Sequence, residues 1–204
     1  MRLSPAFVFV GLALLALTGC PGNAPTRLYV LTATTDKPAS TSPEGAAIGV
    51  GPITLPKYLD RPQIVTRVAA NSLDQANLDQ WGGDLNDNIT RVVATNLSNL
   101  LATDRVSLYP WKDGAPVDFQ VTMDISRFEQ DKDGNAVLNV FWSIVGKDGT
   151  VLLMRRSSYT QPAGEPASQS DNARPFDAQA AAMSRDLALL SHDIATAITG
   201  LKGS

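Results

Sequence analysis

Residues 117–145 read VDFQVTMDISRFEQDKDGNAVLNVFWSIV, and this stretch decides the fold that the sequence predicts. Apolar and polar residues alternate strictly over 117–126. Because successive side chains of a strand point to opposite faces of a sheet, this alternation predicts a strand with one buried face. After a turn at 131–135, residues 136–145 are apolar on both faces. That second pattern predicts a strand that is buried on both sides and central in its sheet.

The sequence on the C-terminal side continues this pattern. The tripeptide Lys147-Asp148-Gly149 predicts a second turn, and residues 150–160 then complete a three-stranded meander. Residues 161–175 are polar and contain several prolines, which indicates a loop. A helix is expected over 176–199, and Gly200 is expected to end it. The apolar stripe of this helix consists of Phe176, Ala180, Met183, Leu187, Leu190, Ile194 and Ile198.

On the N-terminal side, the clearest helix is predicted over 84–102, with Asp84 as its N-cap. Its apolar residues recur at the helical period: Leu85, Ile89, Val92, Val93, Leu97, Leu100 and Leu101. Pro52 and Pro56 should place one strand at a sheet edge or force a bulge in it. The remaining strands are expected at 27–31, 47–55, 63–68 and 105–109, with a short strand and turn within 69–80.

This order of elements predicts an α/β fold, in which a mixed β-sheet with a C-terminal antiparallel meander is covered by two amphipathic helices. The chain has 204 residues, of which 44% are hydrophobic, so it can bury a substantial core. We find no internal repeat. The prediction is therefore a single α/β domain over 27–204.

The N-terminal residues predict a lipid anchor. A short apolar run lies between Arg2 and Cys20, the only cysteine of the chain. The run suits a signal peptide and is shorter than the about 20 residues that a membrane-spanning helix needs. Leu17-Thr18-Gly19-Cys20 resembles the bacterial lipobox, in which the cysteine is acylated and becomes the new N-terminus. The sequence thus predicts a signal peptide at 1–19, acylation of Cys20 and a tether at 20–26.

An alternative interpretation is that Cys20 is an ordinary residue discarded with the signal peptide.

Residue 21 bears on the destination of an acylated chain. In bacteria with two membranes, an aspartate directly after the acylated cysteine commonly marks retention at the inner membrane, and this chain has Pro21. By resemblance to that rule, we expect the inner leaflet of the outer membrane, with the domain facing the periplasm.

The charge of the chain argues against two classes of electrostatic partner. The chain carries 17 basic and 20 acidic residues and has a net charge of −3. No run of lysines or arginines is present, so neither nucleic acid nor an anionic lipid surface is an expected electrostatic partner.

Catalytic residues are not evident. The only histidine, His192, has Ser191 and Asp193 as neighbours on a predicted helix, where adjacent side chains point about 100° apart and form no relay. Glu129 and Asp131 are interpreted as solvated surface carboxylates. We therefore predict no catalytic residue, no metal, no cofactor and no enzymatic activity.

Two short motifs also fail as ligand sites. Residues 131–135 contain acidic side chains, but Gly134 stands at position four and not at position six of a calcium loop. A hairpin turn is the better interpretation of this segment. Gly49-Val50-Gly51 lacks the third glycine and the following helix of a dinucleotide-binding loop.

One further segment carries a family resemblance. Residues 48–67 read IGVGPITLPKYLDRPQIVTR, and the most specific part is Tyr58-Leu59-Asp60-Arg61-Pro62-Gln63-Ile64-Val65. Together with the lipobox and the strand at 27–31, this segment resembles the ABC-type transport auxiliary lipoprotein family, which includes PqiC/YmbA-like lipoproteins. The resemblance covers nearly the whole chain after the signal peptide.

The resemblance implies an outer-membrane lipoprotein that works with an MCE-domain (PqiB-like) protein in lipid transport between membranes. Some members of the family assemble as homo-oligomeric rings. In this chain Tyr58 and Leu59 would be docking residues, because aromatic and aliphatic anchors often lie on loops. Asp60 and Arg61 would pair across a subunit boundary or form a local pair.

Two alternatives remain open at this point. Tyr58 and Leu59 would instead cap the core of their own domain. The whole chain would instead be a stand-alone periplasmic lipid- or ligand-binding lipoprotein, which requires an apolar pocket of several hundred Å3.

Overall fold

The computed structural model describes residues 25–36, 40, 42, 45–111, 116–163 and 176–202. The predicted signal peptide at 1–19, Cys20 and most of the tether at 20–26 lie outside the described residues. So does most of the predicted loop at 161–175.

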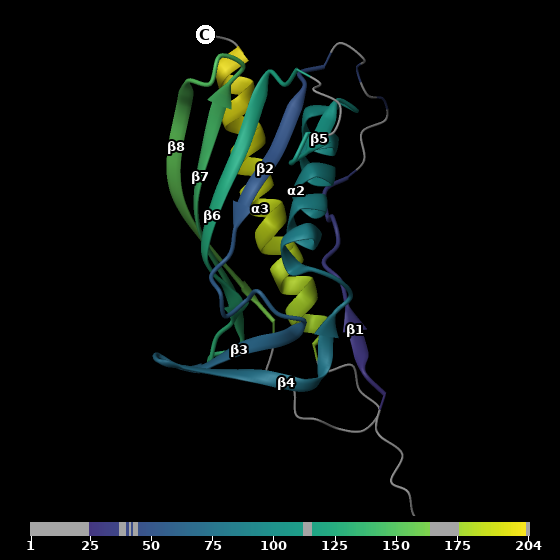
Figure 1. The fold of residues 1–204 in the computed structure, drawn as a ribbon, viewed down its shortest axis with the longest axis vertical. Helices are drawn as coiled ribbons and strands as arrows, with labels where there is room; N and C mark the ends of the chain where they lie inside the picture. The colour runs from purple at the N-terminus through teal and green to yellow at the C-terminus, as the bar shows by residue number, and fades with distance from the viewer. Residues whose placement is uncertain are drawn as a thin grey trace, which may run out of the picture.

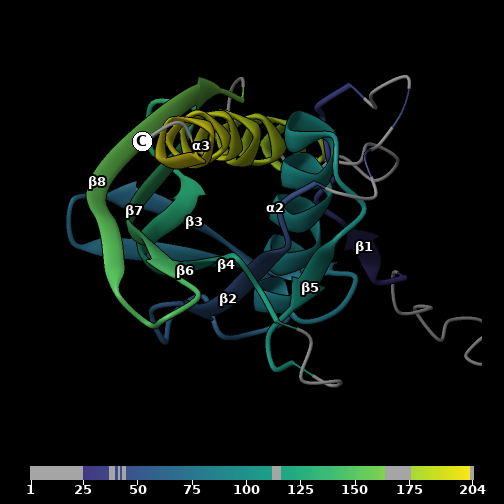
Figure 2. The same ribbon diagram turned by 90° about the horizontal axis from the view of Figure 1, so that it is seen from above.

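The described residues form a curled mixed sheet with two helices on one of its faces (Figure 1). The helices are α2 (Leu85–Leu101) and α3 (Asp177–Lys202). Seen from above, β6, β7 and β8 curve around α3, and α2 lies beside it (Figure 2). The prediction of a mixed α/β fold with two helices is confirmed. The strands are β1 (Arg27–Tyr29), β2 (Ile48–Thr54), β3 (Gln63–Ala69), β4 (Ser72–Trp81), β5 (Val106–Leu108), β6 (Phe119–Gln130), β7 (Asn135–Gly146) and β8 (Val151–Pro162).

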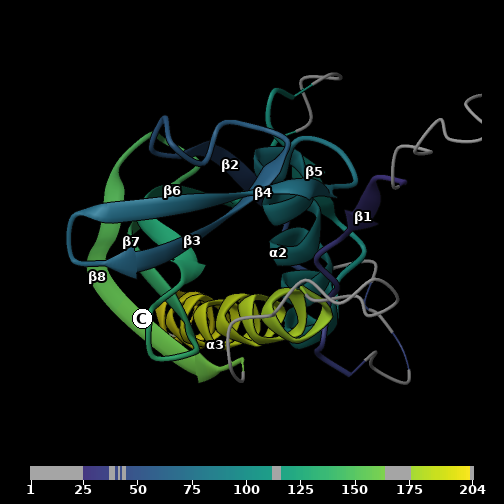
Figure 3. The ribbon, with the colours of Figure 1, turned by 90° about the horizontal axis from the view of Figure 1, so that it is seen from below.

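The sheet follows the order β1-β4-β3-β6-β2-β5, and β7 and β8 branch from β6. Strand β6 is the hub, because it pairs in parallel with β2 and β3 and antiparallel with β7. The long strands β3 and β4 form an antiparallel ribbon that crosses the lower end of the molecule (Figure 3). Residues 72–81 therefore form a full strand where the sequence predicts only a short strand and turn.

Strand β6 continues to Gln130, beyond the region of strict alternation. Its register with β7 shifts between Ile125 and Arg127. This irregularity changes which residues face the core, so Ile125 and Phe128, three positions apart, are both buried. Because of the same irregularity, strict alternation of apolar and polar residues does not extend to the last part of the strand, so this part is not predicted from the sequence.

Strand β7 lies between β6 and β8, as predicted, but it is not buried on both faces. Its inner residues Leu138 and Ile144 are completely buried, whereas Phe141 on the other face is 47% exposed. The prediction of two buried faces is wrong at Phe141, because both described helices cover the same, inner face of the sheet (Figure 2).

The glycines of the Gly49-Val50-Gly51 motif have a packing role. Strand β2 pairs with β5 and β6, so it is not an edge strand, and its register shifts between Val50 and Ile53, next to Pro52. A Cβ atom on Gly49 would lie 2.5 Å from Cη2 of Trp111. One on Gly51 would lie 2.8 Å from Cβ of Tyr109. The two rings are packed edge to face with centroids 5.6 Å apart, so the glycines provide the flat surface that this aromatic pair covers.

The helix ends follow from capping and packing. Asp84 is the N-cap of α2, and its Oδ1 accepts a hydrogen bond from the backbone N of Asp87 at 3.1 Å. The prediction that Gly200 ends the last helix is wrong, because α3 continues to Lys202. Leu201 packs against the core, and this contact favours the extra turn over a break at the glycine.

Helix α3 carries an unpaired carboxyl group into the core. Asp186 is completely buried, and neither of its side-chain oxygens has a hydrogen-bond partner among the described residues. Burial raises the pKa of Asp186 to about 7, and the charge of Arg185 opposes this only in part. The side chain is therefore protonated in the folded chain over most of the acidic pH range.

This carboxyl group makes stability fall as the pH rises. The folded chain holds the proton up to about pH 7, whereas the unfolded chain releases it near its ordinary value of 3.8. The contribution of the protonated Asp186 to the free energy of unfolding is thus fully present below pH 4 and is lost between pH 4 and 7. We expect Asp186→Asn to be more stable than the wild type at pH 8, by up to about 4 kcal/mol.

Urea unfolding of both chains at pH 4 and pH 8 measures this difference. At pH 4 the wild-type carboxyl is neutral, so the two chains should then be of similar stability. If Asp186→Asn were more stable than the wild type by the same amount at both pH values, the raised pKa of Asp186 would be contradicted.

Candidate functional site

The turn that carries the predicted docking residues follows β2 and is closed by the backbone. The backbone N of Leu59 donates to the carbonyl of Pro56 at 2.9 Å. Leu59 is only 3% exposed and belongs to the core, and Tyr58 is half-buried against the core. Asp60 and Arg61 are exposed. The structure therefore separates the four residues into two that support the turn and two that face solvent.

A buried carboxylate holds this turn in place. Glu129 of β6 is completely buried, and its Oε2 accepts hydrogen bonds from Tyr58 Oη at 2.8 Å and from the backbone N of Phe128 at 3.0 Å. Its Oε1 accepts from Arg67 Nε at 2.8 Å and from Arg127 Nε at 2.9 Å. The two arginines neutralise the charge, and all four donors satisfy the carboxylate oxygens, as a buried charge requires.

The prediction that Glu129 is a solvated surface carboxylate is therefore wrong. Its partners Tyr58 and Arg67 both belong to the 48–67 segment, Tyr58 in the turn and Arg67 on β3. Burial, reinforced by the negative charge of Glu129, raises the pKa of Tyr58 to about 12. The hydrogen bond to Glu129 also raises the pKa of Arg67. Both donors thus keep their protons at any physiological pH.

The exposed part of the turn forms one wall of a cleft. Asp60 and Arg61 face Asp84 and Asn86, at the start of α2, across a hollow of about 310 Å3. An adjoining hollow of about 520 Å3 extends the cleft towards Lys57 and Asp87. The walls are tied together, since Asn86 Nδ2 donates to the carbonyl of Ile53 at 2.7 Å.

On the side of the cleft that the turn forms, the charged side chains make only weak, exposed pairs. Lys57 Nζ lies 3.3 Å from Asp60 Oδ2, and both side chains are largely exposed. Arg61 Nη1 donates to Gln75 Oε1 at 2.8 Å on the neighbouring strand β4. Asp60 and Arg61 do not pair with each other in this structure. Exposed pairs of this kind contribute at most about 1 kcal/mol, so a partner can replace them at little cost.

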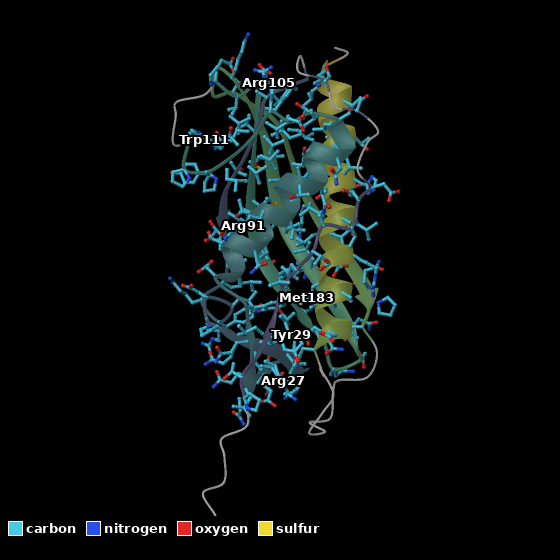
Figure 4. The ribbon with its side chains drawn as sticks, turned by 90° about the vertical axis from the view of Figure 1, so that its right-hand side faces the viewer. Arg27, Tyr29, Arg91, Arg105, Trp111 and Met183 are labelled. Carbon is cyan, nitrogen blue, oxygen red and sulfur yellow. The ribbon has the colours of Figure 1, made fainter. Side chains whose placement is uncertain are left out.

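A second buried carboxylate fastens the first strand. Asp79 of β4 is 1% exposed, and its Oδ1 accepts from Arg27 Nε and from Tyr29 Oη, both at 2.7 Å. Arg27 Nη2 donates to Asp79 Oδ2 at 2.9 Å. Burial and the hydrogen bond to Asp79 raise the pKa of Tyr29 to about 12, and its ring packs edge to face against Phe176. Arg27 and Tyr29 lie together at the lower end of the molecule (Figure 4).

Other features of the described residues fit structural roles. Asp131 Oδ1 accepts hydrogen bonds from the backbone N of Asp133 and of Asn135, both at 2.9 Å, so 131–135 is a hairpin turn. His192 is exposed on α3. In the described part of the chain, no three side chains of metal-binding type come together. Within the same residues, neither helix combines the length and the apolarity of a bilayer-spanning segment.

A family model described as "ABC-type transport auxiliary lipoprotein component" matches residues 29–195. No curated protein matches the sequence significantly. A crystal structure of an uncharacterized protein has a TM-score of 0.64 at 17% sequence identity and covers 85% of this chain and 99% of its own. A Xanthomonas campestris protein of the DUF330 family has a TM-score of 0.64 at 18% identity, with coverages of 86% and 98%. At these identities the two structures are similar to this chain in fold.

The role of Glu129 can be tested by replacing it with glutamine. Glu129→Gln keeps the shape but leaves two partly buried arginines without a counter-charge. We expect the free energy of unfolding to fall by about 3 kcal/mol, as for other buried ion pairs that lose one partner. Urea denaturation measures this change. The matched control is Asp124→Asn, an exposed carboxylate on the same strand, which should change stability by less than about 0.5 kcal/mol. Equal effects of the two substitutions would refute a structural role for Glu129.

Proposed function

We propose that this chain, which belongs to the family of ABC-type transport auxiliary lipoprotein components, is a lipid-anchored docking subunit of an MCE-type system for lipid transport between membranes. In this proposal Cys20 carries the acyl chains, and the domain at 27–204 faces the periplasm from the inner leaflet of the outer membrane. The MCE-domain protein is the partner, and the chain itself has no catalytic role.

The observation that carries the docking role is the way in which the exposed turn is held. A docking surface gains affinity when its contact residues are fixed before the partner arrives, because less side-chain and loop entropy is then lost on binding. Glu129 fixes the turn through Tyr58, and Leu59 fixes it from the core side. Asp60 and Arg61 are thereby presented to solvent at the edge of a cleft.

The composition of the cleft also favours a protein partner. Its lining combines the charged residues Asp60, Arg61 and Asp84 with the apolar residues Leu55 and Leu85. Protein interfaces commonly place polar groups around a small apolar centre. The acyl chain of a lipid would leave these charges without partners, so this cleft does not suit the alternative of a stand-alone lipid carrier.

The anchor rests on the sequence around Cys20. Three acyl chains on one cysteine hold a protein at a membrane far more firmly than one chain, whose binding is marginal and reversible. Pro21 supports the outer membrane as the destination. A homo-oligomeric ring, as in some family members, remains a further proposal.

The anchor predicts how the chain distributes in a bacterium with two membranes. The wild type should fractionate with the outer membrane. A chain whose residues 1–20 are exchanged for a cleavable secretion signal without cysteine should be soluble in the periplasm. Membrane separation followed by immunoblotting measures both, and a wild-type chain found in the soluble fraction would argue against the anchor.

The docking site predicts a loss of partner binding when its charges are reversed. Asp60→Lys and Arg61→Glu should each weaken binding of the MCE-domain protein about tenfold, or about 1.4 kcal/mol. Both side chains are exposed, so the fold should be unaffected. The control is Arg155→Glu, an exposed charge on β8.

Binding can be measured by titrating the purified partner into detergent-solubilised lipoprotein. Unchanged affinity in both cleft variants, with binding intact in the wild type, would place the docking surface elsewhere. If the wild type also fails to bind, the proposal that an MCE-domain protein is the partner is wrong.

A further inference from the structure

Two large apolar side chains are exposed at the first strand, Leu28 on β1 itself and Val30 directly after it. Leu28 and Val30 are each 54% exposed, whereas Tyr29 between them is 3% exposed. Leu28 and Val30 lie on the same side of the chain, since a Cβ atom on Gly82 would meet both of them, at 3.9 Å from Leu28 Cβ and 3.0 Å from Val30 Cγ1. They border a hollow of about 310 Å3 between β1 and the first turns of α3, where Ala180 and Ala181 form the opposite wall. The groove is also lined by Thr32, Asp177 and Ser184, so this edge is apolar along Leu28 and Val30 and polar towards the start of α3.

The same edge is the part of the domain nearest to the proposed anchor. Arg27 lies seven positions after Cys20, and seven fully extended steps of the chain span about 25 Å at most. Helix α3 alone, with 26 residues, is about 39 Å long. The tether is therefore shorter than the domain, and β1 cannot move away from the membrane surface by more than this distance.

Strand β1 is also fixed relative to the rest of the domain. Arg27 and Tyr29 are held by Asp79, and Figure 4 shows both at the lower end, opposite Arg105 and Trp111. In an anchored chain this end of the domain therefore stays within about 25 Å of the bilayer. The short tether gives that end a high effective concentration at the surface, so a small apolar contact suffices for it to rest there.

The charges near this edge indicate what kind of contact forms. The guanidinium of Arg27 is matched by the carboxylate of Asp79, and Asp177, which also lines the groove, is acidic, so none of these residues attracts anionic headgroups. The side chains that face outward, Leu28 and Val30, are aliphatic. Attraction to the membrane must then come from burial of apolar surface, which salt does not screen.

We propose that Leu28, Val30 and the groove between β1 and α3 form a membrane-contact surface, which lies at the boundary of headgroups and acyl chains in the membrane that holds Cys20. This proposal rests on the lipid anchor proposed above. It assigns an orientation to the anchored domain, with β1 against the bilayer and the hairpin between β7 and β8 directed away from it.

The orientation can be measured with single fluorescent labels. Acylation blocks the thiol of Cys20, so a cysteine introduced elsewhere is the only reactive one in the lipoprotein. Leu28→Cys and Val30→Cys, each labelled with an environment-sensitive dye, are reconstituted in phosphatidylethanolamine–phosphatidylglycerol vesicles with brominated acyl chains. Met154→Cys is the matched control, because Met154 is an exposed apolar residue near the start of β8, by the opposite end of the molecule.

We expect the dyes at positions 28 and 30 to lose fluorescence through bromine quenching, at low and at high salt alike. The dye at position 154 should keep its fluorescence. Equal fluorescence at all three positions, in chains that float with the vesicles, would overturn the membrane-contact surface and leave the anchor intact. Chains that carry no acyl group by mass spectrometry and do not float would overturn the anchor together with this surface.

Discussion

Two buried carboxylates, each hydrogen-bonded to arginine and tyrosine, fix the position of the two segments on which the proposed function depends. Glu129 binds Tyr58, Arg67 and Arg127, and Asp79 binds Arg27 and Tyr29. A buried carboxylate is tolerated only when its charge and its oxygens are satisfied, so these groups must stay together while the domain is folded. One carboxylate fixes the turn proposed for docking, and the other fixes the strand that follows the proposed anchor.

These two sites are connected through neighbouring strands. Asp79 lies on β4, which pairs with β3, and β3 carries Arg67 to Glu129. The order β1-β4-β3-β6 therefore forms a continuous path of paired strands from the first strand to the turn proposed for docking. In the function that we propose, this path keeps the exposed residues Asp60 and Arg61 at a defined position relative to the membrane.

The sequence predicts those elements that local pattern determines, and it misses those that depend on distant contacts. The stripe from Leu85 to Leu101 and the cap at Asp84 locate α2 almost to the residue, because both signals lie within the helix itself. Glu129 gives no such signal, since its partner Arg67 is 62 positions away and the irregularity after Ile125 breaks the alternation just before it. The family resemblance picks out the 48–67 segment, but it does not explain why these residue types stand there. The structure gives the reason, because Gly49 packs closely against Trp111 and Tyr58 donates a hydrogen bond to Glu129.

Hydrogen–deuterium exchange of the wild-type chain tests the role of the two carboxylates most directly. If Asp79 and Glu129 hold β1 and the turn proposed for docking as described, the backbone amides of 27–29 and of 58–61 should exchange slowly, on the timescale of the central strand β6. Exchange of both segments at the rate of an unstructured peptide, while β6 remains protected, would contradict this account.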